Sequence, residues 1–218
     1  VNFPPTTLSY NNLQKENITG SQNIFMGDVM YDMVLNAKLE KPEIILPRSF
    51  VLCTIHRQEN TDNPSSLKKI FLTLIELSKK ICVIIPLHPR TKKKLVDHGL
   101  YETVKDNLNI IEPQSYSNLL YLIKKSEIVI SDSGGVPKEA AFLNVPSIFI
   151  GDNIVWQELV DQRWTLLISP KNIKKILTNY KGFIKLLGRR PVKDFGDGNS
   201  AVSIAKTLSN YYIENKND

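Results

Sequence analysis

The chain has 218 residues, of which 42% are hydrophobic and 23% are charged, and its formal net charge is +6. This is the composition of a globular protein, and its two cysteines, Cys53 and Cys82, lie in predicted buried strands without CxxC spacing, so we expect inert core thiols. No apolar run is long enough to span a membrane and no signal peptide opens the chain, so we expect a cytoplasmic protein without a membrane partner. The basic residues are scattered and have no aromatic platform among them, which argues against nucleic acid as a partner.

The first 47 residues are polar and contain several Pro and Asn residues. They predict a short helix at residues 8–15, a short strand at 23–26 and a helix at 29–39 that Asp28 caps. The first residue is Val rather than Met, so we expect a processed chain or a piece of a longer one.

From residue 50 onward, strands and helices are predicted to alternate. Apolar runs predict six strands, at residues 50–55, 81–86, 108–111, 128–131, 146–150 and 165–168. Amphipathic stretches predict helices from residue 64, at 91–98, 115–125, 136–143 and 156–162, and then at 173–180, 183–187 and 199–215. Because the strands are almost wholly apolar, the pattern indicates an α/β fold with a parallel, three-layer, Rossmann-like sheet.

The stretch EIVISDSGGVPKE at residues 127–139 is the most informative one. It predicts a buried strand, a turn containing Ser133, Gly134 and Gly135, and a helix. The first N–H groups of such a helix have no helical partner, and two glycines let an anion approach them, so we interpret the turn as a diphosphate site. The alternative is a tight strand-to-helix connection with an ordinary cap.

Polar residues also follow the first two strands of the sheet. His56 is followed by Arg57 and three further polar residues, and His88 follows the next strand. An imidazole at this rim can act as an acid or base or hold a phosphate, whereas the alternative is a histidine that caps a loop. A metal site between the two histidines is poorly supported, because no third ligand has a regular spacing.

Three residues beside the glycine turn have predicted roles of their own. Glu139 can accept two hydrogen bonds from a ribose diol, although an acid in a first helical turn also simply matches the helix dipole. Asp132 is expected to be buried and to orient the loop, and Lys138 is expected to be solvated. Only Glu59, Asp132 and Glu139 lie near predicted strand ends, so the sheet is equipped to bind a nucleotide but has few carboxylates with which to process it.

Five motifs in order resemble the non-hydrolysing UDP-N-acetylglucosamine 2-epimerases. HRQEN at 56–60 is similar to the family's His-Arg-Arg-Glu-Asn, and PLHPR at 86–90 resembles its next histidine-bearing strand end. IEPQSY at 111–116 looks like its Ile-Glu-Pro-Leu-x-Tyr, and SDSGGVPKEA at 131–140 resembles its Thr-Asp-Ser-Gly-Gly-Ile-Gln-Glu-Glu-Ala. GDG at 196–198 matches its late Gly-Asp-Gly.

The resemblance implies the C-terminal half of a GT-B fold, in which two Rossmann-like domains face each other and the C-terminal one holds UDP. By match, Ser133, Gly134 and Gly135 would bind the diphosphate and Glu139 the ribose. His56 would lie by the diphosphate and contribute to catalysis.

Arg57 and His88 would match positions near a regulatory UDP-N-acetylglucosamine site between the domains. The family reaction inverts C2 of UDP-N-acetylglucosamine by loss and re-addition of UDP, with no metal and no further cofactor, and its proton-moving carboxylates lie in the N-terminal domain.

The resemblance also implies a division of the chain and a set of partners. Residues 1–47 would be an inter-domain segment with a helix, 48–198 the UDP-binding domain, and 199–218 a helix that packs on the N-terminal domain, which is absent here. The expected partners are a nucleotide-sugar, that N-terminal domain and a second copy in a full-length homodimer, and the fragment alone is expected to be inactive.

One segment departs from the family pattern. Many members have Arg-Asp-Thr-Thr-Glu-Arg-Pro-Glu after the strand at 146–150, whereas this chain has GDNIVWQE at 151–158 and lacks both arginines. Trp156 fits a subgroup whose sugar differs, for example a UDP-diacetamido-uronic acid. Gly151 and Val155 leave the phosphate site less positive, so two alternatives stay open: the donor half of a GT-B glycosyltransferase, or a catalytically silent nucleotide-sugar-binding module.

Overall fold

A computed structural model describes residues 1–16, 22–186 and 192–214. Its residues form two compact units, Lys38–Pro191 and a smaller one made of Val1–Ala37 and Val192–Asp218. The predicted domain boundaries at residues 47 and 198 stay a prediction. Within the described ranges, no helix combines the length and the apolar character needed to cross a membrane.

The larger unit contains a six-stranded, all-parallel sheet, as the alternating pattern predicts. The strands are β1 (Phe50–Thr54), β2 (Cys82–Pro86), β3 (Asn109–Ile111), β4 (Ile128–Ser131), β5 (Ser147–Ile150) and β6 (Thr165–Ile168). Their order is β3-β2-β1-β4-β5-β6, so the strand order reverses between β1 and β4. In open sheets of this kind, ligands bind outside the carboxyl ends of the strands at the point of reversal. The register pairs Thr54 with Ser131, so the ends of β1 and β4 are level.

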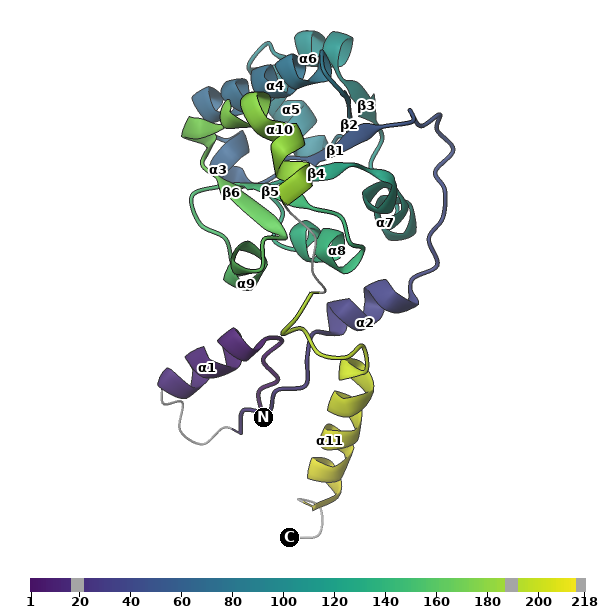
Figure 1. Ribbon diagram of the computed structural model, residues 1–218, viewed down its shortest axis with the longest axis vertical. Coiled ribbons are helices and arrows are strands. Elements are labelled where there is room, and N and C mark those ends of the chain that lie inside the picture. The colour runs from purple at the N-terminus through teal and green to yellow at the C-terminus, as the bar shows by residue number, and fades with distance from the viewer. Residues whose placement is uncertain (17–21, 187–191, 215–218) are drawn as a thin grey trace. The chain divides into compact units, whose positions relative to one another are not determined.

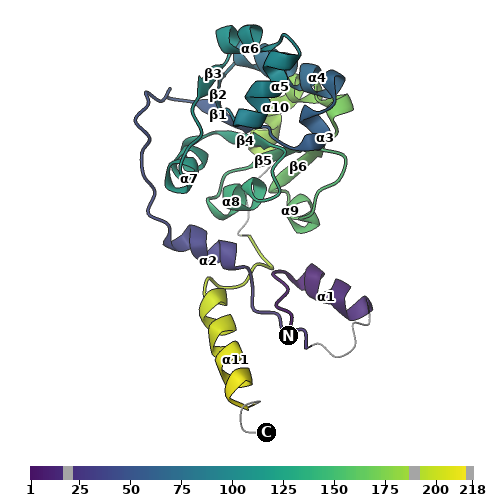
Figure 2. The ribbon, with the colours of Figure 1, turned by 180° about the vertical axis from the view of Figure 1, so that it is seen from behind.

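Helices cover both faces of the sheet, which gives the predicted three layers (Figures 1 and 2). The helices α4 (Pro64–Ser78), α5 (Pro89–Asp97), α6 (Tyr101–Asn107) and α10 (Lys175–Leu186) lie on one face. On the other face lie α7 (Tyr116–Lys125), α8 (Val136–Phe142) and α9 (Gln157–Asp161). The short helices α3 (Gln58–Thr61) and η1 (Pro170–Asn172) follow β1 and β6.

The core explains why the strands are almost wholly apolar. All five residues of β1 are buried, and alternate ones face opposite layers, so that Val51 and Cys53 pack in the cluster that includes Leu67 and Phe71 of α4. Asn63 begins α4 because its side chain accepts the N–H of Ser66 at 3.0 Å. Burial raises the pKa of the Cys53 thiol well above its ordinary value, which agrees with an inert core thiol.

Several predicted elements differ from the structure, and the helix predicted at 29–39 ends at Asn36, because Ala37 has extended backbone. Residues 23–26 form no strand, because only one bridge, between Asn2 and Asn23, pairs this segment. The break predicted between two helices after residue 180 is wrong, because α10 is continuous from Lys175 to Leu186. Its apolar stripe, which includes Ile176, Tyr180 and Phe183, continues past Gly182 and packs on the core. The helices α3 and α6 were not predicted. The predicted ends at residues 187 and 215 lie outside the described residues.

The smaller unit contains α1 (Thr7–Lys15), α2 (Val29–Asn36) and α11 (Ser200–Glu214). Gly27 and Gly196 both have φ +90° and approach so closely that a Cβ on Gly27 would lie 2.7 Å from the Cα of Gly196. Asp32 of α2 accepts the N–H of Ala201 at the start of α11 at 2.6 Å. The Gly-Asp-Gly motif is therefore a structural turn, in which Asp197 accepts the N–H of Asn199 at 3.0 Å.

Candidate functional site

The segment after β1 is held in place by one buried carboxylate at the end of β4. Asp132 is fully buried and accepts the backbone N–H of His56 at 2.9 Å and that of Arg57 at 3.0 Å. The side-chain amide of Asn60 donates to the same carboxylate at 3.0 Å and also to the carbonyl of Ile150 at 3.2 Å. Asp132 therefore positions the segment after β1 as well as its own turn, which extends the prediction made for it.

Hydroxyl groups order the glycine turn itself. The side chains of Thr54 and Ser131 share a hydrogen bond of 2.7 Å, and the oxygen of Ser131 also accepts the N–H of Ser133 at 2.9 Å. Within the described residues, the N–H groups of Gly134 and Val136 donate to no protein acceptor. Pro137 follows at the second helical position and has no N–H to offer. These two unpaired hydrogen-bond donors at the N-terminal end of α8 could bind an anion.

A cavity of about 300 Å³ opens where the sheet order reverses. Its lining brings together five of the residues predicted from the sequence, namely His56, His88, Ser133, Gly135 and Glu139. The rings of His56 and His88 lie 5.8 Å apart, centre to centre. The imidazole of His88 accepts the N–H of Arg90 at 3.2 Å through Nδ1, so it also caps α5 and, when neutral, carries its proton on Nε2.

Glu139 is a buried carboxylate in this cavity, one turn into α8. Burial raises its pKa, while the hydrogen-bonded hydroxyl of Tyr116 and the charge of Lys138 act in the opposite direction. Burial, together with the charge of Glu139 and the hydrogen bond, raises the pKa of Tyr116 to about 12. Tyr116 is thus a neutral donor that orients the Glu139 carboxylate.

Arg57 and Gly134, the two remaining predicted residues, lie next to each other beside this cavity. A Cβ on Gly134 would lie 3.3 Å from Nη2 of Arg57, so the guanidinium lies against the glycine turn. Arg57 also lies over the ring of Phe149, 5.6 Å from its centre. Within the described residues, no group of three His, Cys, Asp or Glu side chains could hold a metal ion.

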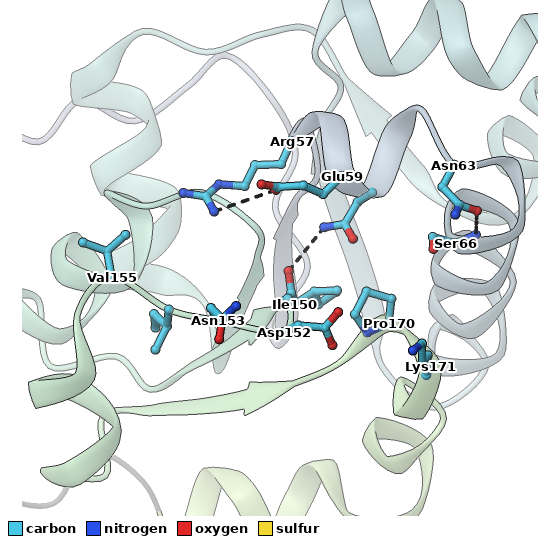
Figure 3. A pocket seen from close by; sticks show the side chains of 13 residues that line it. Arg57, Glu59, Asn63, Ser66, Ile150, Asp152, Asn153, Val155, Pro170 and Lys171 are labelled. Carbon is cyan, nitrogen blue, oxygen red and sulfur yellow. Dashed lines mark hydrogen bonds and ion pairs between the residues drawn. The ribbon is translucent and has the colours of Figure 1, made fainter.

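Arg57 also lines a second cavity, which has a volume of about 540 Å³ (Figure 3). Residues 150–155 and Pro170 form one part of its lining, and Glu59, Asn63 and Ser66 form another. The Arg57 and Glu59 side chains approach to 3.9 Å. Arg57 lines this larger cavity, whereas Ser133 and Gly135 of the glycine turn line the smaller one.

Comparison with known proteins points to one family. The family model described as UDP-N-acetylglucosamine 2-epimerase matches residues 1–209.

The chain belongs to the UDP-N-acetylglucosamine 2-epimerase family.

Two curated relatives and one solved structure illustrate the similarity. A UDP-N-acetylglucosamine 2-epimerase homolog from Methanococcus maripaludis is 39% identical, over 95% of this chain and 60% of the relative. A UDP-2,3-diacetamido-2,3-dideoxy-D-glucuronate 2-epimerase from Pseudomonas aeruginosa is 35% identical, over 72% of this chain and 45% of the relative. The Methanocaldococcus jannaschii UDP-GlcNAc 2-epimerase, solved in complex with UDP-GlcNAc and UDP, superimposes with a TM-score of 0.83 at 32% identity, over 95% of this chain and 60% of that one. The chain thus spans about 60% of the length of the epimerase homolog and of the solved structure.

The structure gives a physical reason for one departure from the family pattern. A Cβ on Gly151 would lie 2.6 Å from the ring of Phe149, which is buried, so an arginine does not fit here without displacing that ring. The Phe149 ring therefore leaves no room for an arginine side chain at residue 151. The same ring packs against the guanidinium of Arg57 beside the glycine turn.

Sequence reasoning misjudged one residue of the site and did not foresee the contacts of two others. Lys138 was expected to be solvated, but it is 5% exposed and its Nζ lies 3.8 Å from the centre of the Trp156 ring. The prediction failed because α8 is buried along its whole length, which a charged residue in a first turn does not reveal. No pattern in the sequence links Tyr116 to Glu139, or the Trp156 indole to the Gly134 carbonyl that it reaches at 2.7 Å.

Proposed function

We propose that this chain binds UDP in the cavity between the ends of β1 and β4, as the nucleotide-holding C-terminal half of a GT-B epimerase. The observation that carries the proposal is that five residues implied by the family motifs line one cavity at the reversal point of the sheet. The family match and the similarity to a structure solved with UDP-GlcNAc and UDP support the identity of the ligand.

Each residue has a role that follows from its surroundings. The unpaired N–H groups of Gly134 and Val136 would donate to the diphosphate oxygens, and the guanidinium of Arg57 beside Gly134 would add positive charge. The Glu139 carboxylate, oriented by Tyr116, would accept hydrogen bonds from the two ribose hydroxyls. His56, whose backbone Asp132 fixes, would direct its ring toward the phosphate next to the sugar.

For the whole protein we propose epimerisation at C2 of a UDP-sugar. The bond from the anomeric carbon to the diphosphate oxygen breaks and a base takes the C2 proton, which gives UDP and a glucal. A proton then returns to C2 from the opposite face while the diphosphate oxygen adds back to the anomeric carbon. Groups in this chain would stabilise the negative charge that develops on the departing UDP. Glu139 and the buried Asp132 are already engaged in hydrogen bonds, so the base for the C2 proton would come from the N-terminal half.

The sugar has two candidates. UDP-N-acetylglucosamine follows from the family description, and a UDP-diacetamido-uronic acid follows from the Pseudomonas aeruginosa relative and from Trp156. The smaller cavity would hold the UDP part, which both candidate substrates share. Residues that contact the sugar would therefore decide between the two.

Calorimetric titration with UDP tests the first part of the proposal. We expect heat from one site, and no heat at millimolar UDP would contradict it. Joining the chain to an N-terminal half and assaying C2 inversion of both candidate sugars tests the second part. Retained turnover of a sugar donor after His56→Ala would favour the glycosyltransferase alternative, and binding without turnover in the joined protein would favour the silent module.

A further inference from the structure

The indole of Trp156 fixes the orientation of one peptide in the glycine turn. Its Nε1–H donates to the carbonyl of Gly134 at 2.7 Å, from a residue 22 positions away in the sequence. A trans peptide is planar, so the N–H of Gly135 in the same peptide unit points to the side opposite that carbonyl. On that side it lies 3.4 Å from the hydroxyl of Ser133, and both residues line the smaller cavity.

Without this contact, the peptide between the two glycines would have little to hold it. Glycine populates positive and negative φ about equally, so a Gly-Gly peptide can rotate and reverse its N–H at low cost. The hydrogen bond that the Gly135 N–H donates to the hydroxyl of Ser133 is long and weak at 3.4 Å. The short bond from Trp156 is therefore the stronger of the two constraints on this peptide.

Lys138 in turn holds the indole. Its ammonium lies 3.8 Å from the centre of the Trp156 ring, and the residue is 5% exposed. A cation this close to an indole face, away from water, is strongly attracted by the ring quadrupole. Lys138 and Trp156 come from different helices, α8 and the start of α9, so the pair ties the start of α9 to the turn before α8.

We propose that Trp156 is a positioning residue for phosphate binding, which holds the Gly135 N–H toward the cavity and is itself held by Lys138. The inference rests on the proposed function, because it assigns the phosphates of the nucleotide to this N–H. It also explains how a chain that lacks the two arginines of many relatives keeps an ordered phosphate turn.

The variant Trp156→Phe tests the inference, because it keeps an aromatic ring beside Lys138 and removes the N–H that reaches Gly134. Trp164→Phe is the matched control, since Nε1 of the buried Trp164 has no partner in the described part of the chain. Titrations with UDP and with uridine separate the phosphate contact from the rest of the site. We expect Trp156→Phe to weaken UDP binding about fivefold to tenfold and to leave uridine binding within about twofold. Trp164→Phe should change neither.

A measurement without ligand separates this inference from the proposed function. Amide hydrogen exchange or NMR line broadening at Gly135 reports the orientation of the peptide directly. We expect Trp156→Phe to accelerate exchange or broaden the Gly135 signal, and Lys138→Met to do so to a smaller extent. An unchanged Gly135 signal, or equal losses for UDP and uridine, would overturn the role of Trp156. Failure of the wild-type chain to bind UDP would instead overturn the proposed function, and the Gly135 signal would still decide the inference.

Discussion

Replacing Asp132 with Asn should destabilise the fold far more than an isosteric change on the surface does. The carboxylate is fully buried and its two oxygens receive the N–H groups of His56 and Arg57 and the amide of Asn60. In Asp132→Asn, one oxygen becomes an NH₂ group that must face one of these donors. A stabilising charged acceptor is lost at the same time.

The magnitude follows from these contacts. Losing one hydrogen bond to a charged group costs about 1.5–3 kcal/mol, and leaving a buried donor unpaired costs about 1–3 kcal/mol. Their sum, about 2.5–6 kcal/mol, is a large part of the stability of a typical domain. For a chain of this size the midpoint of thermal unfolding should fall by about 5–24 °C.

Thermal unfolding followed by circular dichroism checks this prediction. Asp106→Asn is the control, because Asp106 is an exposed residue of α6 and the charge change is the same. It should alter the free energy of unfolding by less than about 0.5 kcal/mol. If Asp132→Asn lowers the midpoint no more than the control does, the carboxylate does not hold the segment after β1, and the geometry of His56 needs another explanation.

Three further predictions follow from other residues. Burial raises the pKa of Glu139, so the folded state binds the carboxyl proton of Glu139 more tightly than the unfolded chain does. The free energy of unfolding therefore falls as pH rises from about 4.5 through the raised pKa. Glu139→Gln cannot lose this proton, so the difference in unfolding midpoint between the variant and wild type should be more favourable to the variant at pH 7 than at pH 4. A difference that does not change with pH would contradict the raised pKa of Glu139. Gly27→Ala should lower the free energy of unfolding by about 2–4 kcal/mol, because residue 27 has φ +90° and its Cβ would collide with Ser200. Amide hydrogen exchange in α11 should then accelerate, and unchanged exchange there would refute the close approach. Gly151→Ala should cost about 1–3 kcal/mol in urea unfolding because it displaces the buried Phe149 ring, and an unaltered midpoint would show that the ring gives way freely.

The sheet could be predicted from the sequence because its signals are local and consistent. Apolar runs such as residues 128–131 are both strong strand formers and buried on two faces. Helix starts were predictable where a cap residue precedes Pro at the first helical position, as Asn63 precedes Pro64. The continuous helix α10 was missed because the contact of its apolar stripe with the core outweighs the helix-breaking tendency of Gly182, and that contact is not local.

The site was predictable only in its outline. The ends of β1 and β4 bear His56 and the glycine turn, and any parallel pairing of these strands brings them to one edge. The side chains that hold them come from elsewhere in the sequence. Trp156 reaches Gly134 across 22 residues, and Asn60 reaches Asp132 across 72. Contacts of this separation depend on the packing of α3 and α9, which no local pattern specifies.

The location of bound UDP tests the central claim most directly. An NMR titration of the ¹⁵N-labelled chain with UDP reports which amides lie near the ligand. We predict that the largest shifts occur at Gly134, Gly135 and Val136, around the smaller cavity. Shifts concentrated at residues 151–155 and Lys171, around the larger cavity in Figure 3, would contradict the assignment of the diphosphate to the glycine turn.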